Sequence, residues 1–569
     1  MTRIVQRQAP AIVVADLQAS GVSALMARLL AARGVAAVKQ LSAHLSDLLP
    51  PDTLTNNGHM AKLLADAIAA DKKLLVIGDY DADGATATAV AVKGLRALGA
   101  TVDFLVPNRF EYGYGLSPEI VALAASQKPD VIITVDNGIA SVDGVAAAHA
   151  LGLQVLITDH HLPGSITPAA ACIINPNQHG CHFASKHLAG VGVIFYALLA
   201  LRAELRERGA YTTKAAPNLS ELLDLVALGT VADLVKLDDN NRILVEQGLR
   251  RIRAGACSLG ILALLRISGR QIPACNAQDL GFYVGPRLNA AGRLDDMSLG
   301  IRCLLAETES EARDLAQRLQ DLNVARRNIE ADMQAGATLS LDDMNVADQY
   351  TISIYQADWH QGVIGILASR IKERYHRPVI SFASAGDGVL KGSGRSIAGL
   401  HLRDALDVLS KQQPDLILKF GGHAMAAGLS IKLEDFALFS AGFEAVVKGL
   451  ITEADLESVL EVDGSLDFTD MSLATAQLLE NQVWGQGFAP PLFYDEFTVV
   501  HQRLLADKHL KLSLKPRAAP ETLLVDAICF NRSKFFAGPI LAAYQLQTNS
   551  YNGTQKVQLN LRHVEHVPQ

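Results

Sequence analysis

The chain has 569 residues, of which 49% are hydrophobic and 19% are charged. This composition is typical of folded globular proteins and excludes a disordered chain, and the length predicts about three domains. We expect neither a membrane span, because every run of about 18 residues contains charge, nor a secretory signal. The formal net charge of −8 does not exclude nucleic-acid binding, because bound divalent cations would offset part of it. Six cysteines without paired spacing predict reduced thiols in a cytoplasmic protein.

The first part of the chain, to about residue 216, alternates strand and helix signals, which favours a parallel sheet covered on both faces. Such sheets bind ligands at the carboxyl ends of their strands. Ser117 is expected to cap a helix that has Glu119 in its first turn. A further helix, a loop at 230–241 and another helix continue the domain to about residue 248. The expected strands are 73–78, 101–106, 131–135 and 154–157, and the expected helices are 84–98, 117–125 and 140–151.

A charge-rich stretch from about residue 304 to 337 has leucine and isoleucine at helical spacing and no glycine or proline until its last turn. It predicts a long amphipathic helix that joins two lobes, although an ordinary surface helix would show the same pattern. A second α/β segment follows from 351 to about 450. Beyond residue 460, short strands and an Asn552-Gly553 hairpin signal favour a small barrel, for which an oligonucleotide-binding (OB) barrel is one option. Those strands are expected at 497–501, 510–514, 523–530, 542–548 and 556–561.

Three aspartates, Asp79, Asp81 and Asp83, follow the first predicted strand at alternate positions. Aspartate is poor material for a helix or a strand, and like charges that converge need a cation to offset their repulsion. A solvated acidic turn is the plainer alternative. A calcium loop is a weaker one, because its twelfth position holds Val90 instead of glutamate. The strand before the loop and the helix after it favour a catalytic site.

Two further strands end in the same way, one before Asp136 and the next before Asp159-His160-His161. Asp233 follows another small, apolar segment. These groups would line one edge of a parallel sheet, and carboxylates with one or two imidazoles suit manganese or magnesium better than zinc. Two such ions can activate water and stabilise phosphoryl oxygens.

The chain resembles known proteins through several motifs in order. The first four resemble the motifs of the DHH phosphoesterase superfamily, the next two resemble its DHHA1 domain, and the last narrows the likeness to the RecJ family of bacterial single-stranded-DNA-specific exonucleases. The segments are Gly78–Gly84, Val135–Gly138, Asp159–His161 and Gly229–Asp233; Ser393–Ser396 and Phe420–Gly428; and Gly285–Arg293.

This resemblance implies roles for the residues that match. A two-manganese centre would be held by Asp81, Asp83, Asp136, His160 and Asp233. Asp79 and Asp159 would ligate a metal or hold the histidines, and His161 would contact the scissile phosphate or assist proton transfer. We class these last three as catalytic.

The residues expected to bind DNA lie in three places. Glycines, hydroxyls and a guanidinium at 392–396 make a plausible phosphate cradle, although a plain Gly/Ser turn would look the same. The resemblance adds the turn with His423, and the helix segment with Arg287 could contact backbone phosphates. Tyr112 or Tyr114 offers a face for base stacking. The full set is Arg109, Tyr112, Arg287, Asn289, Arg293, Ser393, Gly394, Arg395, Ser396, Gly422 and His423.

Two other motifs carry less weight. A zinc site could be imagined from Cys172, Cys181, His179, His182 and His187, but the chain has no Cys-x-x-Cys pair. Separately, residues 190–192 (Gly-Val-Gly) lack the third glycine of the dinucleotide-binding fingerprint.

The resemblance implies an α/β protein: an N-terminal segment (1–60), a parallel-sheet DHH domain (61–303), a connecting helix (304–340), a smaller α/β DHHA1 domain (341–452) and an OB-type barrel (453–569). It implies 5′-to-3′ removal of mononucleotides from single-stranded DNA in recombination and mismatch repair, with two Mn²⁺ or Mg²⁺ ions. We expect a cytoplasmic monomer, with a single-stranded-DNA-binding protein and a helicase as possible partners. The rivals are an oligonucleotide or cyclic-dinucleotide phosphodiesterase, a pyrophosphatase, a non-catalytic DHH-like scaffold and a metal-free DNA-binding module.

Overall fold

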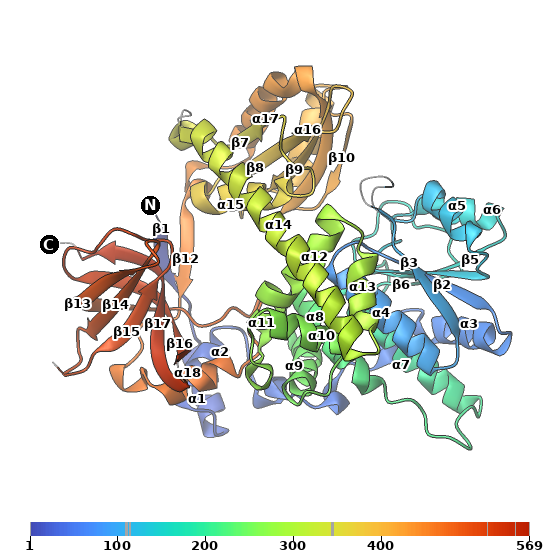
Figure 1. Ribbon diagram of the computed structural model, residues 1–569, viewed down its shortest axis with the longest axis horizontal. Helices are drawn as coiled ribbons and strands as arrows, with labels where there is room; N and C mark the ends of the chain where they lie inside the picture. Colours follow the sequence, from blue (N-terminus) through green and yellow to red (C-terminus); the bar gives the residue numbers. More distant parts are fainter. Residues whose placement is uncertain are drawn as a thin grey trace. The chain divides into compact units, whose positions relative to one another are not determined.

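The computed structural model describes residues 2–108, 112, 115–342, 346–520, 522–551 and 553–567. The chain forms two compact units, which are described separately. The large unit comprises Gln6–Gln320 and Glu461–Gln569, and the small unit comprises Met1–Val5 and Asp321–Leu460. Figure 1 shows the elements of both in sequence colours.

The large unit contains a five-stranded sheet in the order β3-β2-β4-β5-β6, in which every neighbouring pair is parallel. The central strands β2, β4 and β5 are nearly continuous apolar runs, because both faces of the sheet are buried there. The four predicted strands are confirmed, and the short edge strand β6 was not predicted. The strands are β2 (Lys73–Gly78), β3 (Thr101–Leu105), β4 (Val131–Val135), β5 (Gln154–Thr158) and β6 (Cys172–Ile174).

The chain passes from β2 outward to β3 and then crosses back to β4 on the other side of β2. Loops that leave the carboxyl ends of β2 and β4 therefore diverge, which opens a place for a ligand at this edge. Helices α5 (Pro118–Ser126) and α6 (Val142–Ala150) bury one face through Ile120 and Val145, which pack in one core with strand residues such as Ile132. Helices α4 (Ala82–Ala97) and α7 (Gly190–Glu207) contact the strands from the other face.

The predicted helices of this domain are confirmed, and Ser117 caps α5 by accepting a hydrogen bond from the Ile120 N–H. The loop predicted at 230–241 is shorter than expected. Helix α8 (Leu223–Ala232) continues to Ala232, and α9 (Asp239–Arg253) begins early because Asp238 accepts from the Asn241 N–H at 2.9 Å. Helices α10 (Leu259–Ile267), α12 (Gly285–Leu294) and α13 (Ser298–Leu305) complete this part, and a π-helical turn at Leu280–Val284 precedes α12.

The long predicted helix exists, but its predicted start at residue 304 is wrong. Residues 304 and 305 end α13, and α14 runs over Glu309–Asp342. The chain breaks between the two helices, where the Thr308 hydroxyl accepts from the Glu311 N–H at 3.3 Å and caps α14. Helix α14 passes from the large unit into the small one at residue 321.

The small unit has a sheet in the order β10-β11-β9-β8-β7, with β7 and β8 parallel and the other pairs antiparallel. Phe382 on the sheet packs against Phe439 on α17, with ring centroids 5.3 Å apart. This α/β segment agrees with the prediction for 351–450. Its elements are β7 (Ile352–Tyr355), α15 (Ile364–Tyr375), β8 (Val379–Ser384), β9 (Val389–Arg395), α16 (Leu402–Gln412), β10 (Lys419–Gly422), β11 (Ala426–Lys432) and α17 (Phe436–Leu450).

The C-terminal part of the large unit is a closed barrel in the order β13-β14-β15-β17-β16. The five predicted strands are confirmed; β15 is shorter than predicted, and the other four are longer. Gly553 has φ +77°, which suits a tight hairpin turn, while Asn552 lies outside the described residues. The strands are β13 (Phe493–Leu505), β14 (His509–Pro516), β15 (Val525–Cys529), β16 (Ile540–Tyr551) and β17 (Thr554–His566).

The N-terminal residues contact segments far away in the sequence. Strand β1 (Thr2–Gln6) pairs with β12 (Ser458–Val462). Arg33 forms a buried ion pair with Asp463 at 2.9 Å, which holds the N-terminal helices to the start of the barrel segment. Through the whole part of the chain that is described, each helix is too short or too polar to cross a membrane.

Candidate metal centre

The aspartate loop is built by β2 and the first turn of α4. Asp81 is the N-cap of α4 and accepts from the Gly84 N–H at 3.0 Å, and Asp83 is fully buried in the first turn. Asp79 accepts from the Tyr80 N–H at 2.8 Å. A Cβ on Gly84 would lie 2.5 Å from the Asp79 carbonyl oxygen, so the loop can close this tightly only with glycine there.

Asp136 follows β4 in a left-handed backbone conformation, with φ +61°. The neighbouring Asn137 donates from its amide to the carbonyl oxygens of Ile77 at 3.1 Å and Val135 at 2.9 Å. These bonds tie the ends of β2 and β4 together, so the aspartates on the two loops are held next to each other.

The Asp159-His160-His161 segment follows β5 and is fixed by its own hydrogen bonds. Buried Asp159 accepts from the Ile139 N–H at 2.9 Å and lies 2.7 Å from Nδ1 of His161. The amides of Asn175 and Asn177 donate to the carbonyl oxygens of His161 and His160, at 2.8 and 2.6 Å. The backbone of both histidines is therefore held in place, and Asp159 also orients the His161 ring.

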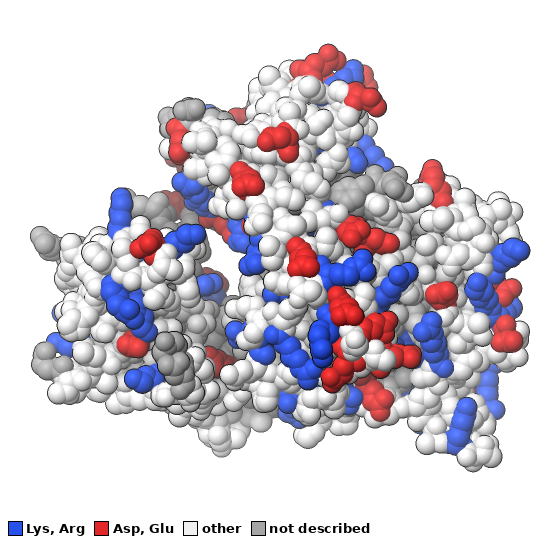
Figure 2. Space-filling view, in the orientation of Figure 1, with Lys and Arg blue, Asp and Glu red and all other residues white. Residues whose placement is uncertain are grey.

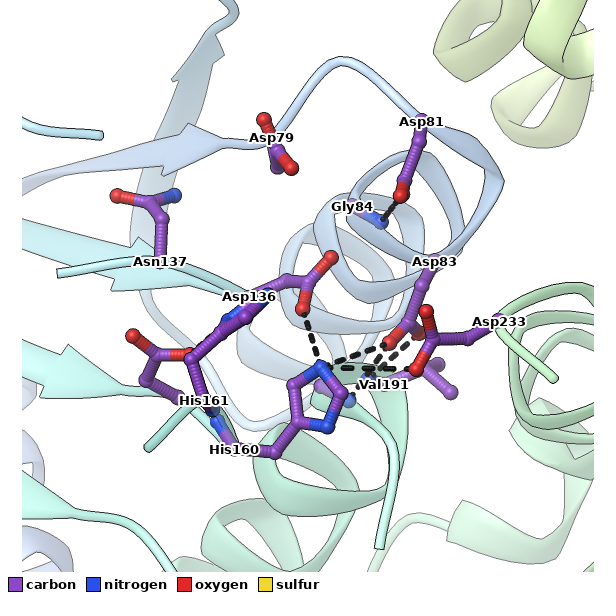
Figure 3. A network of polar contacts seen from close by, with 12 residues as sticks. Asp79, Asp81, Asp83, Gly84, Asp136, Asn137, His160, His161, Val191 and Asp233 are labelled. Carbon is purple, nitrogen blue, oxygen red and sulfur yellow. Dashed lines mark hydrogen bonds and ion pairs between the residues drawn. The ribbon is translucent and has the colours of Figure 1, made fainter. Parts of the chain in front are cut away.

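The acids from separate elements converge on His160 (Figure 3). Its Nε2 lies 3.0 Å from Oδ1 of Asp136, 3.6 Å from Oδ2 of Asp233 and 3.9 Å from Oδ2 of Asp83. Asp79, Asp81 and Asp136 form a second group whose ligand atoms lie within 4.8 Å of one another. Asp136 thus belongs to both groups. Three carboxylates around one imidazole, with two further acids beside them, make a donor set that fits Mn²⁺ or Mg²⁺.

The electrostatics of these carboxyls favour a bound cation. Burial first, and then the charge of Asp81, raises the pKa of Asp83 to about 7. Burial and the charge of Asp83 also raise the pKa values of Asp136 and Asp233 well above the ordinary range for aspartate. The carboxyls therefore repel each other enough to hold protons near neutral pH, which a divalent ion would displace.

His161 and Asp159 form a separate pair with the opposite electrostatics. Burial alone would lower the pKa of His161, but the hydrogen bond and charge of Asp159 raise it to about 9. Burial acts to raise the pKa of Asp159, yet the bond and charge of His161 hold it below its ordinary value. The pair is therefore an imidazolium and a carboxylate at neutral pH.

Helix α7 supplies a contact that the sequence analysis missed. The backbone N–H groups of Gly190 and Val191 donate to the two oxygens of Asp83, at 2.7 and 3.0 Å. The Gly-Val-Gly signal was considered only as a nucleotide-binding motif. The glycine pattern at a helix start was the available clue, but its partner is over 100 residues away.

Helix α12 packs against the aspartate loop. Oδ1 of Asn289 accepts from the Ala82 N–H at 2.8 Å, and a Cβ on Gly292 would overlap the carbonyl oxygen of Tyr80. Arg287 is 8% exposed and donates to the Tyr283 carbonyl oxygen at 2.5 Å, whereas Arg293 is partly exposed in the last turn. The segment thus adjoins the candidate metal centre, and DNA contacts by these three side chains stay predictions.

In the small unit, four of the predicted phosphate-binding residues lie together; we call Ser393, Arg395, Gly422 and His423 the arginine cluster. Arg395 ends β9 and donates to Ser393 Oγ at 3.2 Å and to the Gly394 carbonyl oxygen at 2.8 Å. It is paired with Ala426 across the sheet, beside the turn that carries His423. Gly422 has φ +144°, and a Cβ there would lie 2.5 Å from Cα of Ala427.

Other predicted DNA-binding residues are placed differently. Ser396 is buried, and its hydroxyl donates to the Leu400 carbonyl oxygen at 2.9 Å, so it holds a turn. Tyr112 is partly buried and packs against the sheet core of the large unit. Arg109 and Tyr114 lie outside the described residues.

Three family profiles match the chain. The DHH family, N-terminal domain, covers residues 73–230; the DHHA1 domain covers 347–449; and the RecJ OB domain covers 462–563. These matches agree with the fold seen here, a parallel-sheet domain followed by a second α/β domain and a barrel.

Similar proteins extend over nearly the whole chain. The single-stranded-DNA-specific exonuclease RecJ of Dickeya dadantii is 51% identical over 554 residues, which covers 95% of this chain and 96% of that protein. RecJ of Escherichia coli is 49% identical over 558 residues, with 96% of each covered. The structure of RecJ in complex with Mn²⁺ from Thermus thermophilus matches with a TM-score of 0.83 at 29% identity, covering 100% of this chain and 80% of that one. This chain belongs to the RecJ family.

Proposed function

We propose that this protein is a single-stranded-DNA-specific exonuclease that removes mononucleotides from the 5′ end by metal-dependent phosphodiester hydrolysis. The observation that carries this proposal is the convergence of Asp83, Asp136 and Asp233 on His160, at 3.0 to 3.9 Å. The relatives that share nearly the full length are named for the same activity. The relatives thus indicate the substrate, and the donor set independently indicates metal-dependent hydrolysis.

The residues present fit two divalent cations. We assign one to Asp83, His160 and Asp233 and the other to Asp79 and Asp81. Asp136 would be shared, because it groups with Asp79 and Asp81 and also lies 3.0 Å from Nε2 of His160. When bound, two such ions would activate a water molecule and stabilise the attacking and leaving oxygens of the phosphodiester. RecJ from Thermus thermophilus has been solved with Mn²⁺ and with Mg²⁺, and we propose Mn²⁺ as the preferred ion here.

His161 is suited to hold the scissile phosphate. Asp159 keeps the imidazole charged and fixes its orientation through Nδ1. A positive imidazole attracts an anionic phosphate and stabilises the charge that develops on it during hydrolysis. Asp159 therefore acts through His161, in addition to holding the backbone N–H of Ile139.

The arginine cluster would bind the DNA backbone, with Arg395 supplying the charge and the glycine turn allowing close approach of a phosphate. Arg293, on α12 beside the aspartate loop of the large unit, would contact a phosphate of the DNA backbone. We further propose that the protein acts as a monomer in the cytoplasm, in recombination and mismatch repair. A single-stranded-DNA-binding protein and a helicase would deliver its substrate.

The test uses the purified full chain and DNA labelled at either end. Single-stranded and blunt duplex substrates are digested with Mn²⁺ and then with chelator, and products are sized by electrophoresis. We expect mononucleotides released from the 5′ end of the single strand, with the duplex resistant and all activity lost on chelation. Hydrolysis that survives chelation, or that consumes both substrates equally, would contradict the proposal.

A further inference from the structure

The N-terminus of helix α7 points at the most buried ligand of the candidate metal centre. The Gly190 N–H donates to Oδ2 of Asp83 and the Val191 N–H donates to Oδ1; Figure 3 shows the contact with Val191. Each carboxylate oxygen is thus held by one backbone donor of the same helix turn. The partial positive charge of a helix N-terminus adds to the attraction. Asp83 is therefore fixed in position and in rotation by groups that cannot move independently of α7.

The same helix turn contacts Asp136 from the other side. A Cβ on Gly190 would lie 2.5 Å from Oδ1, 2.6 Å from Cβ and 2.7 Å from Cγ of Asp136. Real Cβ atoms do not approach other atoms so closely, so any larger residue would push Asp136 away or tilt the start of α7. Gly190 does not have the left-handed backbone that often explains a glycine, since α7 begins at this residue. Close approach to Asp136 is the reason for glycine here.

A second glycine encloses Asp83 from α8. A Cβ on Gly229 would overlap the hydroxyl of Thr86 and lie 2.8 Å from Oδ1 of Asp83. Asp83 therefore lies in a slot with the α7 backbone on one side and α8 on another. A shift of the start of α7 would therefore carry Asp83 with it, because both its oxygens are bonded to that helix turn.

We propose that Gly190 is a positioning residue that sets the separation of Asp83 and Asp136, and so allows the centre to bind both cations tightly. Gly190 touches neither the DNA nor a cation; it acts through the two carboxylates, because its N–H fixes one of them and its missing side chain makes room for the other. This inference rests on the metal centre assigned under the proposed function. It goes further because it names the residue on α7 that sets the distance between two of the proposed ligands.

The main test compares Gly190→Ala with the control Gly94→Ala. Gly94 lies on α4, and its added Cβ would overlap the tip of Leu198 on α7. The control therefore disturbs the same helix pair with the same chemical change, but its nearest contacts are with Leu198 and not with a carboxylate of the metal centre. Binding of Mn²⁺ to the metal-free proteins is measured by electron paramagnetic resonance, which counts free ions directly and reports coupling between two bound ions. Melting temperatures in chelator report folding.

We expect Gly190→Ala to bind Mn²⁺ about 10- to 100-fold more weakly at one or both sites, the usual cost of losing support around a ligand. The signal of coupled ions should be lost at Mn²⁺ concentrations that saturate the wild type, and raised Mn²⁺ should restore part of the hydrolysis. Gly94→Ala should bind Mn²⁺ like the wild type. Equal affinity in Gly190→Ala and wild type, or an equal loss in both variants, would overturn the inference. A wild type that binds no Mn²⁺ would instead overturn the proposed function.

A double variant keeps the inference testable if Gly190→Ala folds poorly. In an Asp136→Gly background all three overlapping atoms, including Cβ, are absent and the added methyl group has space. Gly190→Ala should therefore lower the melting temperature in chelator much less there than it does in the wild type. Coupling of this kind between neighbours is what a double-mutant cycle measures. The same loss in both backgrounds would show that Gly190 does not act through Asp136 and would reject the inference.

Discussion

Carboxylates gather in the large unit of this protein, whereas the small unit carries the arginine cluster. In the large unit, buried Asp83 and Asp136 lie beside Asp233, and burial and mutual repulsion raise the pKa values of all three. In the small unit, partly buried Arg395 donates to a hydroxyl and a carbonyl oxygen. The first arrangement lowers stability until a cation binds, whereas the second offers a guanidinium group that an anion can contact. The comparison separates the residues proposed to bind metal from those proposed to bind DNA.

Net charge hides this difference. On the face drawn in Figure 2, basic side chains are scattered, and acidic side chains gather near the start of α14, where Glu307, Glu309 and Glu311 are exposed. The formal charge of −8 therefore includes surface acids as well as buried candidate ligands. Net charge could not reveal a DNA-binding protein here, because binding depends on where each charge lies.

The largest expected effect is that of Asp136→Asn, which removes the charge shared by both groups of ligands. We expect no detectable hydrolysis of single-stranded DNA. The melting temperature of the metal-free protein should rise by a few degrees, because a buried and repelled carboxylate is lost. Calorimetry in chelator and a nuclease assay with Mn²⁺ measure the two effects. A fully active variant, or one less stable without metal, would show that Asp136 is not the strained ligand described here.

Arg395→Ala should come next and should affect DNA rather than metal. Loss of a charge-assisted contact is expected to raise KM about tenfold or more, with a smaller change in kcat. Mn²⁺ affinity should not change. Arg403→Ala is the matched control, since Arg403 is an exposed arginine on α16 of the same unit. If both substitutions raise KM equally, the effect comes from the loss of one positive charge anywhere in the unit. Arg395 would then have no specific contact with the DNA.

The two regions should also differ in their response to pH. The pKa of Asp83 is about 7 without metal, so below pH 7 a cation must displace a proton. We expect Mn²⁺ affinity to fall up to about tenfold per pH unit between pH 7 and 5, whereas the charge on Arg395 is constant. Calorimetric titration in buffers of different ionisation enthalpy counts the released protons. Proton release of zero at pH 6 would contradict the raised pKa.

The same shift predicts the stability of the metal-free protein. The folded pKa of Asp83 lies above its ordinary value of 3.8, so its contribution favours the fold at low pH and is lost as the pH rises through about 7. Melting temperature in chelator should therefore fall between pH 5 and 8, and Mn²⁺ should raise it most at pH 8. The assignment would be contradicted by the opposite pattern in chelator. In that pattern the melting temperature of the wild type stays constant or rises with pH, while that of Asp83→Asn falls.

Asn289→Ala should have the smallest effect. Which quantity changes, metal affinity and kcat or DNA binding, distinguishes two roles for Asn289. The structure shows Asn289 holding the Ala82 N–H at the aspartate loop, whereas the sequence predicted a contact with a DNA phosphate. Loss of one such hydrogen bond, worth about 1 kcal/mol, should lower kcat or Mn²⁺ affinity about fivefold. Unchanged values of both, together with weaker DNA binding, would favour the predicted phosphate contact.

Features set by local sequence were predictable. The strands of the large unit are apolar runs bounded by turns, and the carboxyl ends of parallel strands meet at one edge, so Asp83, Asp136 and His160 could be expected near each other. Asp233 was expected there too, although it caps a helix instead of following a strand. The barrel strands were found from their alternation and turns.

Features set by distant partners were not predictable. Nothing near residue 190 indicates that its N–H will meet Asp83, and strand β6, with three residues, is too short to give a periodic signal. Ser396 has the residue type of a phosphate ligand, yet its hydroxyl is used within its own turn. The pairing of β1 with β12 likewise joins segments about 450 residues apart in sequence, which single-sequence patterns do not reveal.

The buried pair of Arg33 and Asp463 has a consequence for synthesis on the ribosome. Its partners are separated by 430 residues, and a chain grows by about 5–20 residues per second. Arg33 must therefore wait on the order of 20–90 s before its carboxylate has been made. During that interval the first helices of the nascent chain lack the neighbour that holds them, while the DHH sheet between them can already fold. The N-terminal helices should thus become protected from protease later than the DHH sheet, and only after Asp463 has emerged.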